Sequence, residues 1–275
     1  MTGSNPVPPT TLEIMISQYL VPRDKCQETR DKHYGPAPST LKLERNGQVL
    51  YYFGSNHSHD PTNKQYPLLK DLWKEFLNKT DDQDRLVLIE GGLRPVADSE
   101  VAAIHQGVEG GLITLLATKE GLDLQSPDIP VNSLIGEYPQ GQRSIADLYW
   151  FLINLNSYLN RPNPKPNFEG WFAQWYRYSH QTIRGGFHSS LDDLKATYKE
   201  TIGKEFDLEE SPDPLINPNN TNTPINSISQ ELSDLRDTKI INEIEKLWKE
   251  GKSLFIVFGQ GHLIIQEPAL RKLTA

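Results

Sequence analysis

Short apolar runs and longer stretches of helical spacing alternate along this chain. Three runs of aromatic, β-branched and other apolar residues are typical of buried strands, and they lie at 49–53, 86–89 and 253–258. The run at 40–44 precedes the first of these, and the Asn46-Gly47 pair between them predicts a tight hairpin turn. The short run at 122–125, which leads into a polar segment, predicts a fifth strand.

Apolar residues three and four positions apart predict helices between these strands. The clearest stripe predicts a helix over 229–250 that ends at Gly251. This stripe consists of Leu232, Leu235, Ile240, Ile244 and Leu247. Further helices are predicted over 66–80, 98–107, 109–120, 144–159 and 168–183. The Pro- and Asn-rich segment 211–224 has no periodicity and predicts a loop or a lid.

Strands that alternate with helices predict an α/β fold, in which helices flank a mixed or parallel central sheet on both faces. A chain of 275 residues is long enough to form one large domain with a sizeable core. We expect an extended N-terminal lead-in over 1–39, which is rich in proline and polar residues, and a single domain over 40–275. Residues 140–230 predict a helical and loop insert in that domain.

Composition narrows the partners and compartments that suit the chain. A formal net charge of -8 argues against nucleic acid or an anionic membrane as the main partner. The single cysteine, Cys26, excludes an internal disulfide. The N-terminal residues lack a secretory signal pattern, and no apolar run approaches the roughly 18 residues of a membrane helix. We therefore expect a soluble, cytoplasmic protein without a membrane segment, whose oligomeric state the sequence leaves open.

Two of the apolar strands lead into the same motif, a glycine followed three positions later by a histidine. The run at 49–53 continues as GSNH to His57, and the run at 253–258 continues as GQGH to His262. Chance gives about half a Gly-x-x-His in a chain of this composition, so a single occurrence is weak. A third, which ends at His188, follows a polar segment. Because α/β sheets bind ligands at the carboxyl ends of their strands, we expect His57 and His262 to converge.

Glycine at a strand end allows a sharp turn, after which the histidine can project over the edge of the sheet. A third strand supplies a carboxylate, because the run at 86–89 is followed by Glu90. Two imidazoles and a carboxylate, from His57, His262 and Glu90, suit a divalent metal such as Mn, Co or Zn, with open positions for water. Such an ion lowers the pKa of bound water and polarises a carbonyl group. Without an ion the same groups can act as general base and acid, and the sequence does not separate the two chemistries.

Four segments of the chain match a known pattern in both content and order. They are YYFGSNHSHDP, LVLIEGG, VEGGLITLLATKEGLDLQSPD and LRDTKIINEIEKLWKEGKSLFIVFGQGHL. Together they resemble the TraB/PrgY/GumN family, which includes the TIKI proteases and has erythromycin esterase and ChaN as more distant relatives. The resemblance covers about 41–273, matches poorly over 140–230, and is most specific in the last segment.

This resemblance implies a TIKI-like or esterase-like fold whose site consists of His57, Glu90, Glu109, Arg236 and His262. TIKI-like members imply a metal-dependent protease, and esterase-like members imply a hydrolase without a metal. Asp128 falls near a position where the family often has a further acid. His59 and Asp60, which the chain adds beside the first motif, are candidates for substrate binding together with Asp128.

We therefore expect a hydrolase, assisted by a divalent metal, that cleaves a peptide, amide or ester bond in a small molecule or a peptide. In this hypothesis Glu90 or Glu109 is a ligand or general base, and Arg236 stabilises developing negative charge. One alternative is a metal-independent esterase in which a histidine activates water. A second is a binding protein that uses the same pocket for haem, a metal or a peptide signal. Glu109 has a structural alternative of its own, which is to stabilise the N-terminus of its helix.

Overall fold

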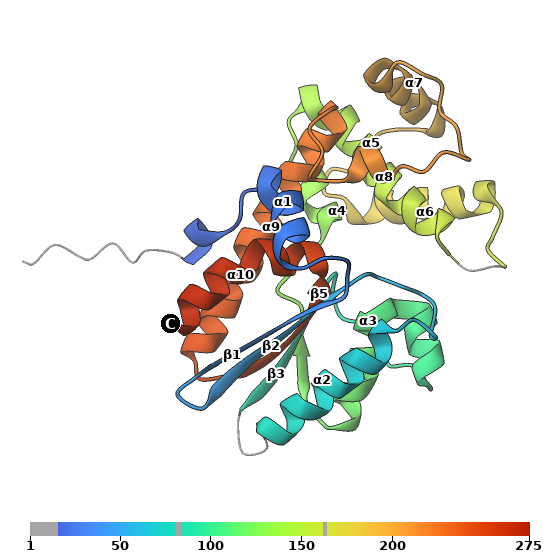
Figure 1. The fold of residues 1–275 in the computed structure, drawn as a ribbon. Coiled ribbons are helices and arrows are strands. Elements are labelled where there is room, and N and C mark those ends of the chain that lie inside the picture. Colours follow the sequence, from blue (N-terminus) through green and yellow to red (C-terminus); the bar gives the residue numbers. More distant parts are fainter. Residues whose placement is uncertain (1–15, 81–83, 162–163) are drawn as a thin grey trace, which may run out of the picture.

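A computed structural model describes residues 16–80, 84–161 and 164–275 (Figure 1). A five-stranded sheet with the strand order β1-β2-β5-β3-β4 forms its centre. The strands are β1 (Ser39–Arg45), β2 (Gln48–Ser55), β3 (Arg85–Ile89), β4 (Asp123–Gln125) and β5 (Ser253–Gly259). β1 and β2 form the predicted antiparallel hairpin, whereas the β2-β5, β5-β3 and β3-β4 pairs are parallel. The prediction of an α/β fold with a mixed or parallel central sheet is confirmed, and the sheet is mixed.

Helices cover both faces of the sheet, as Figure 1 shows. One face carries α9 (Pro224–Lys249) and α10 (Gln260–Thr274), and the other carries α2 (Gln65–Lys79) and α3 (Glu100–Lys119). Side chains alternate between the two faces along each strand. In β2, Leu50 and Tyr52 pack under α9 and α10, whereas Val49 and Phe53 pack under α2 and α3. Every residue of the central strand β5 is buried, because helices lie on both sides of it.

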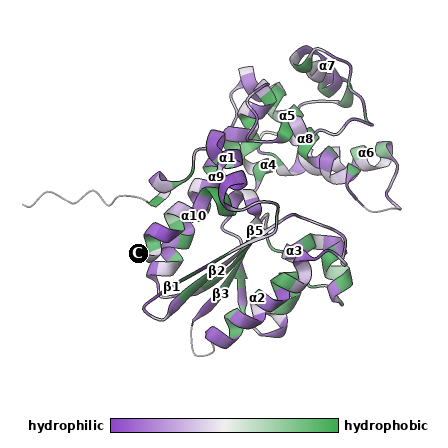
Figure 2. Cartoon of the chain, viewed as in Figure 1, coloured by the Kyte–Doolittle hydropathy of each residue, from purple (hydrophilic) through white to green (hydrophobic). Residues whose placement is uncertain are grey.

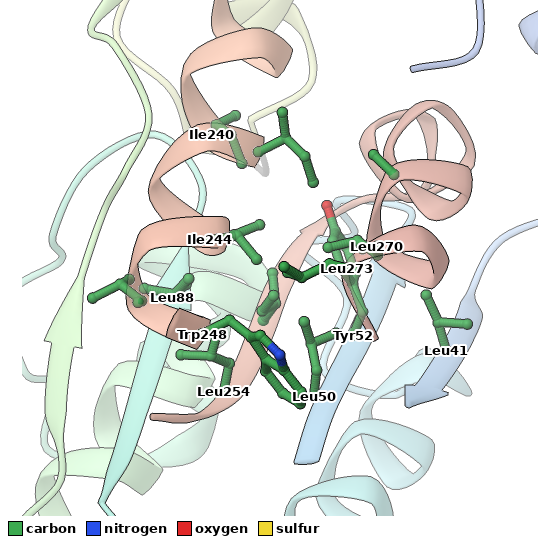
Figure 3. Packing of buried hydrophobic residues seen from close by; sticks show 14 of the residues in the cluster. Leu41, Leu50, Tyr52, Leu88, Ile240, Ile244, Trp248, Leu254, Leu270 and Leu273 are labelled. Atoms are coloured by element: carbon green, nitrogen blue, oxygen red, sulfur yellow. The ribbon is translucent and has the colours of Figure 1, made fainter. Parts of the chain in front are cut away.

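Three residues of the predicted α9 stripe, Ile240, Ile244 and Leu247, pack in the core between this helix and the sheet. Figure 3 shows Ile240, Ile244 and Trp248 of α9 beside strand residues such as Leu254, with Leu270 of α10 across from them. Two members of the predicted stripe differ, because Leu235 is 47% exposed and Leu232 packs in a second core. In Figure 2 the central strands carry mainly hydrophobic residues, whereas the helices alternate between hydrophobic and hydrophilic residues. This alternation is typical of helices that face a core on one side only.

The insert predicted over 140–230 lies in a helical unit that begins earlier, at Val131, and has a second apolar core. Its helices are α4 (Val131–Ile135), α5 (Gln140–Leu159), α6 (Phe168–Thr182), α7 (Leu191–Ile202) and α8 (Asp213–Ile216). The first part of α9 completes this core through Ile225, Ile228 and Leu232. α9 begins earlier than predicted, at Pro224, because the Thr223 side chain accepts a hydrogen bond from the Asn226 N–H and caps the helix.

The expected extended lead-in is partly helical where the structure describes it. Residues 16–39 contain a 3-10 helix (Ile16–Tyr19) and α1 (Arg23–His33), while residues 1–15 lie outside the described residues. Burial of Cys26 against Ile264 and Ile265 holds α1 on α10. α1 packs against residues from the last fifty of the chain. Its own sequence is polar and has no apolar stripe, so the local pattern did not predict a helix. No helix in the described ranges is long and apolar enough to cross a membrane.

Shortening an apolar side chain of α9 tests which face of this helix contributes to the stability of the core. Ile244→Ala removes a fully buried side chain, so the free energy of unfolding should fall by about 2–5 kcal/mol. Leu235→Ala changes an exposed residue of the same helix and should cost less than about 1 kcal/mol. Urea denaturation followed by circular dichroism measures both values. Equal losses in the two variants would contradict the packing of α9 described above.

Candidate functional site

The carboxyl ends of β2, β5 and β3 lie together because the three strands are parallel neighbours. Ser55 of β2 pairs with Gly259 of β5, and Ile89 of β3 pairs with Val257 of β5. The residues that follow these strands, His57, Glu90 and His262, therefore meet at one edge of the sheet. His57 Nε2 lies 3.6 Å from Glu90 Oε2, and His262 Nε2 lies 3.3 Å from Glu90 Oε1. Both histidines thus face one carboxylate, as the strand-end motifs predict.

A second carboxylate holds the other ring nitrogen of each histidine. His57 Nδ1 lies 2.6 Å from Glu109 Oε1, and His262 Nδ1 lies 2.6 Å from Asp237 Oδ1. A carboxylate at Nδ1 fixes the orientation of an imidazole and makes Nε2 the reactive nitrogen. The two histidines are therefore held in the same way, by carboxylates that come from different helices, α3 and α9.

The contact between His57 and Glu109 is accompanied by two unfavourable backbone conformations. His57 has φ 54°, and Val108, which precedes Glu109, has φ 47°. A left-handed conformation costs a residue other than glycine about 1–3 kcal/mol, and β-branched valine adopts it rarely. At Val108 this conformation bends α3 between the two helices predicted at 98–107 and 109–120. The bend brings the 4%-exposed carboxylate of Glu109 behind the His57 ring.

The glycines of the two motifs provide space rather than a sharp turn. Neither Gly54 nor Gly259 has a positive φ. A Cβ atom on Gly259 would lie 2.6 Å from His57 Nε2, and one on Gly54 would lie 3.0 Å from a methyl carbon of Leu263. The expectation of a turn glycine is therefore replaced by close approach of a side chain to the backbone. The Gly259 N–H also donates to Glu90 Oε2 at 2.8 Å.

Arg236 and Asp128 form a two-bond ion pair beside Glu90. Arg236 Nε lies 2.7 Å from Asp128 Oδ1, and Nη2 lies 2.6 Å from Asp128 Oδ2. The same Nη2 donates to Glu90 Oε1 at 3.1 Å. The side chain of Asp128 is only 3% exposed. Asp128 therefore orients Arg236 from behind, and its expected role in substrate binding has no support from this geometry.

Asp237 is a site residue that the sequence prediction missed. Besides His262, its carboxylate accepts hydrogen bonds from Gln266 Nε2 at 2.6 Å and from the Arg23 guanidinium. Its position directly after Arg236 in the matched LRD segment was the signal that could have identified it. Arg23 had no such signal, since it lies in α1 and is 214 residues from Asp237 in sequence.

His59 and Asp60 lie outside this cluster. His59 Nδ1 lies 3.0 Å from the carbonyl oxygen of His105. The Asp60 carboxylate accepts hydrogen bonds from the backbone and the hydroxyl of Thr62 and so closes a local turn. The structure does not bring either side chain to Glu90, and the expected role in substrate binding has no support from their contacts.

The charges of the cluster shift the pKa of each histidine upward. Burial lowers the pKa of His57, but Glu109 and then Glu90 raise it more, to about 9. Burial likewise lowers the pKa of His262, and Asp237 and Glu90 raise it to about 9. Burial raises the pKa of Glu90, yet His262, His57 and Arg236 hold it well below its usual range. These contacts therefore favour the imidazolium form of both histidines.

Charge balance gives the cluster two possible states. Four enclosed carboxylates, those of Glu90, Glu109, Asp128 and Asp237, contact its cationic groups, while the largely exposed Asp234 also pairs with Arg23. Among the enclosed groups, Arg23 and Arg236 balance two of the charges, which leaves two negative charges when the histidines are neutral. Two protons on the histidines or one divalent cation would restore neutrality.

Within the described residues, no group of three or more His, Cys, Asp and Glu side chains has the arrangement of a formed metal site. His57 contacts one oxygen of Glu90, and His262 contacts the other. The types of donor nevertheless suit a divalent cation. Two imidazoles carry carboxylates on their far nitrogens, which is how metal-binding histidines are commonly held.

A cavity of about 1020 Å³ lies over the cluster. His57, which is 49% exposed, and the more enclosed His262, which is 11% exposed, both line it together with Glu90 and Arg236. The helical unit contributes part of the wall, including Tyr149 and Asn154 of α5 and Asn217 and Pro218 from the predicted loop 211–224. A space of this size suits a ligand of moderate size. His57 is the histidine more accessible to such a ligand.

Comparisons with known proteins add no family to this description. No family model matches the chain, and neither a curated protein nor a solved structure matches it significantly. The resemblance to the TraB/PrgY/GumN family therefore rests on the motif residues quoted above and stays a prediction.

Two glycines of the GQGH motif provide a matched test of the close approach to His57. Gly259→Ala places a methyl group within contact of His57 Nε2, so the ring must move and its contact with Glu90 should weaken. Gly261→Ala has open space at the new methyl group and should leave the ring unchanged. The imidazole resonances of His57 in NMR spectra report both results. If the two variants give the same spectrum as the parent protein, the close approach is incorrect.

The raised pKa values predict how stability depends on pH. A histidine whose pKa is raised to about 9 in the folded state, from 6.5, contributes stability that is complete below 6.5 and is lost as pH rises through 9. The free energy of unfolding, measured by urea denaturation with a chelator present, should therefore fall between pH 6.5 and 9. Glu109→Gln should lower the pKa of His57 in an NMR titration and remove part of this fall. Asp60→Asn, outside the cluster, should leave both unchanged.

Proposed function

We propose that this chain is a hydrolase that cleaves a peptide, amide or ester bond at the His57, Glu90 and His262 cluster. One observation carries the proposal. Two imidazoles, each with a carboxylate on Nδ1, face the same carboxylate from adjacent strand ends and line a cavity. Paired acid and base groups at the edge of a cavity are what the addition of water to a carbonyl group requires.

The residues have distinct roles in this proposal. His57 is the more exposed histidine, and in its neutral form Nε2 accepts a proton from the attacking water while Glu109 stabilises the imidazolium that forms. His262 is enclosed and held by Asp237, so its imidazolium acts as a fixed donor. Arg236 supplies a permanent positive charge beside Glu90, which stabilises negative charge that develops on the substrate.

A divalent metal, such as Mn, Co or Zn, suits the chemistry of these donors. His57, His262 and Glu90 are the residues that would hold it, and the two negative charges left by neutral histidines would balance it. When bound, the ion would polarise the carbonyl group and lower the pKa of a water molecule. In this version Glu109 and Asp237 keep the two rings oriented.

A metal-independent hydrolase is the second candidate, and the contacts of Glu90 favour it. Both oxygens of this carboxylate already accept hydrogen bonds, one from the Gly259 N–H and the other from Arg236. The carboxylate is therefore engaged within the protein. In this version His57 must lose a proton whose pKa is about 9 before it can act as a base, so activity should rise as pH increases toward that value.

A matched pair of histidines tests the proposed function. The assay follows release of 4-nitrophenol from nitrophenyl esters and of a fluorophore from a peptide library. His57→Ala should lower kcat/KM by about a hundredfold or more, because it removes the group that accepts the proton. His59→Ala, only two positions away but outside the cluster, should change kcat/KM by less than about threefold. Equal effects of the two substitutions would contradict the proposed site.

Chelation and pH separate the two versions of the reaction. Activity that disappears with EDTA and returns with added Mn²⁺, Co²⁺ or Zn²⁺ supports the metal-assisted version, and elemental analysis of the protein identifies the ion. Activity that survives EDTA and rises toward pH 9 supports the version without a metal. If no ester or peptide is cleaved but haem titration produces a Soret band, the chain is a binding protein instead.

A further inference from the structure

The cavity over the cluster is basic although the chain as a whole is acidic. The protein has a formal net charge of -8. Among the described residues that line the cavity, Glu90 is the one carboxylate, whereas Arg23, Arg30, Arg94 and Arg236 all line it. A cavity with this charge attracts anions even when the remaining surface repels them.

Two of these arginines are balanced within the protein. Arg23 pairs with Asp234 and Asp237, and Arg236 pairs with Asp128 and Glu90. They therefore belong to the charge balance of the histidine cluster. Arg30 and Arg94 line the same cavity but take no part in this charge balance.

Arg30 and Arg94 contact neutral acceptors in the described part of the chain. Arg30, near the end of α1, donates from Nη1 to Gln27 Oε1 at 3.2 Å, and its Nε is buried without a hydrogen-bond partner. Arg94, between β3 and α3, donates to the carbonyl oxygens of Gly91 at 2.9 Å and Glu90 at 3.4 Å. Neither guanidinium forms an ion pair with a described carboxylate, so each brings an uncompensated positive charge to the lining of the cavity.

A guanidinium keeps its charge at any physiological pH and offers two parallel N–H donors. These donors match the two oxygens of a carboxylate or of a phosphate, and the resulting bonds are stronger than bonds between neutral groups. Arg30 of α1 and Arg94 of the segment between β3 and α3 bring two such groups to the same cavity.

We infer that the ligand of this cavity carries an oxyanion group, a carboxylate or a phosphate, and that Arg30 and Arg94 recognise it. In the proposed function this ligand is the substrate, so the inference adds its chemical class to that proposal. The oxyanion would bind at the arginines while the bond to be cleaved lies at His57 and Glu90. Neutral molecules of the same shape would leave both guanidinium charges uncompensated and would bind more weakly.

Calorimetric titration of the full chain tests this inference, with sodium succinate and inorganic phosphate as separate probes at constant ionic strength. The parent protein should bind at least one anion saturably. Arg30→Gln and Arg94→Gln should each weaken this binding by about tenfold, because each removes a charge-assisted contact. Arg184→Gln is the matched control, since Arg184 pairs with Glu137 at the surface and does not line the cavity. This variant should bind as tightly as the parent protein.

The two anions also distinguish the source of the oxyanion. Binding of succinate alone indicates a ligand with a carboxylate, and binding of phosphate alone indicates a phosphate ester. A loss confined to one variant supports an oxyanion ligand but assigns its recognition to that arginine and overturns the role of the other. The inference is overturned if the parent protein binds neither anion, or if both arginine variants bind like Arg184→Gln.

This binding test is independent of catalysis. If the anions bind through the arginines but no ester or peptide is cleaved, the proposed function fails while the anion site stands. If His57→Ala abolishes cleavage but the arginine variants bind anions like the parent protein, the proposed function stands and the oxyanion inference fails.

Discussion

Burial of several carboxylates at one edge of a sheet is the constraint on which this structure depends. A buried charge without a partner is strongly unfavourable, so each carboxylate needs a cation or several hydrogen-bond donors nearby. Glu90 obtains them from two histidines, Arg236 and a backbone N–H. Asp237 obtains them from His262, Gln266 and Arg23. Strand ends, helices and the N-terminal segment are thus brought together by the same electrostatic requirement.

The long helix α9 carries two charged residues of the cluster, Arg236 and Asp237. It packs in two apolar cores, and this packing fixes where the two residues lie. Its first part packs in the helical unit through residues such as Ile228, and its last part packs on the sheet through residues such as Ile244. Arg236 and Asp237 lie between these parts, where the apolar packing changes from one core to the other. Arg236 lines the cavity and contacts Glu90 at the sheet edge, so the cavity, the sheet edge and the helical unit meet at this point of the helix.

The sequence predicted the features that local patterns encode. Apolar runs identified the strands, and the order of strand and motif was sufficient to place His57, Glu90 and His262 at one edge. Other features depend on contacts between distant parts of the chain. Arg23 lies 214 residues from Asp237, so no local pattern joins them, and α1 was predicted as extended for the same reason. The positive φ of Val108 has no sequence signal, because valine is a poor residue for that conformation.

The continuity of α9 has a consequence for how the cavity selects its ligands. The helix has 26 residues, which at 1.5 Å per residue gives a rod about 39 Å long. It contains no proline or glycine after its first residue, so nothing in its sequence provides a flexible joint. A rod that is fixed in both cores holds opposite walls at a set spacing. The affinity of a ligand would then depend on how well it fits a preformed cavity, and domain closure would contribute little to the free energy of binding.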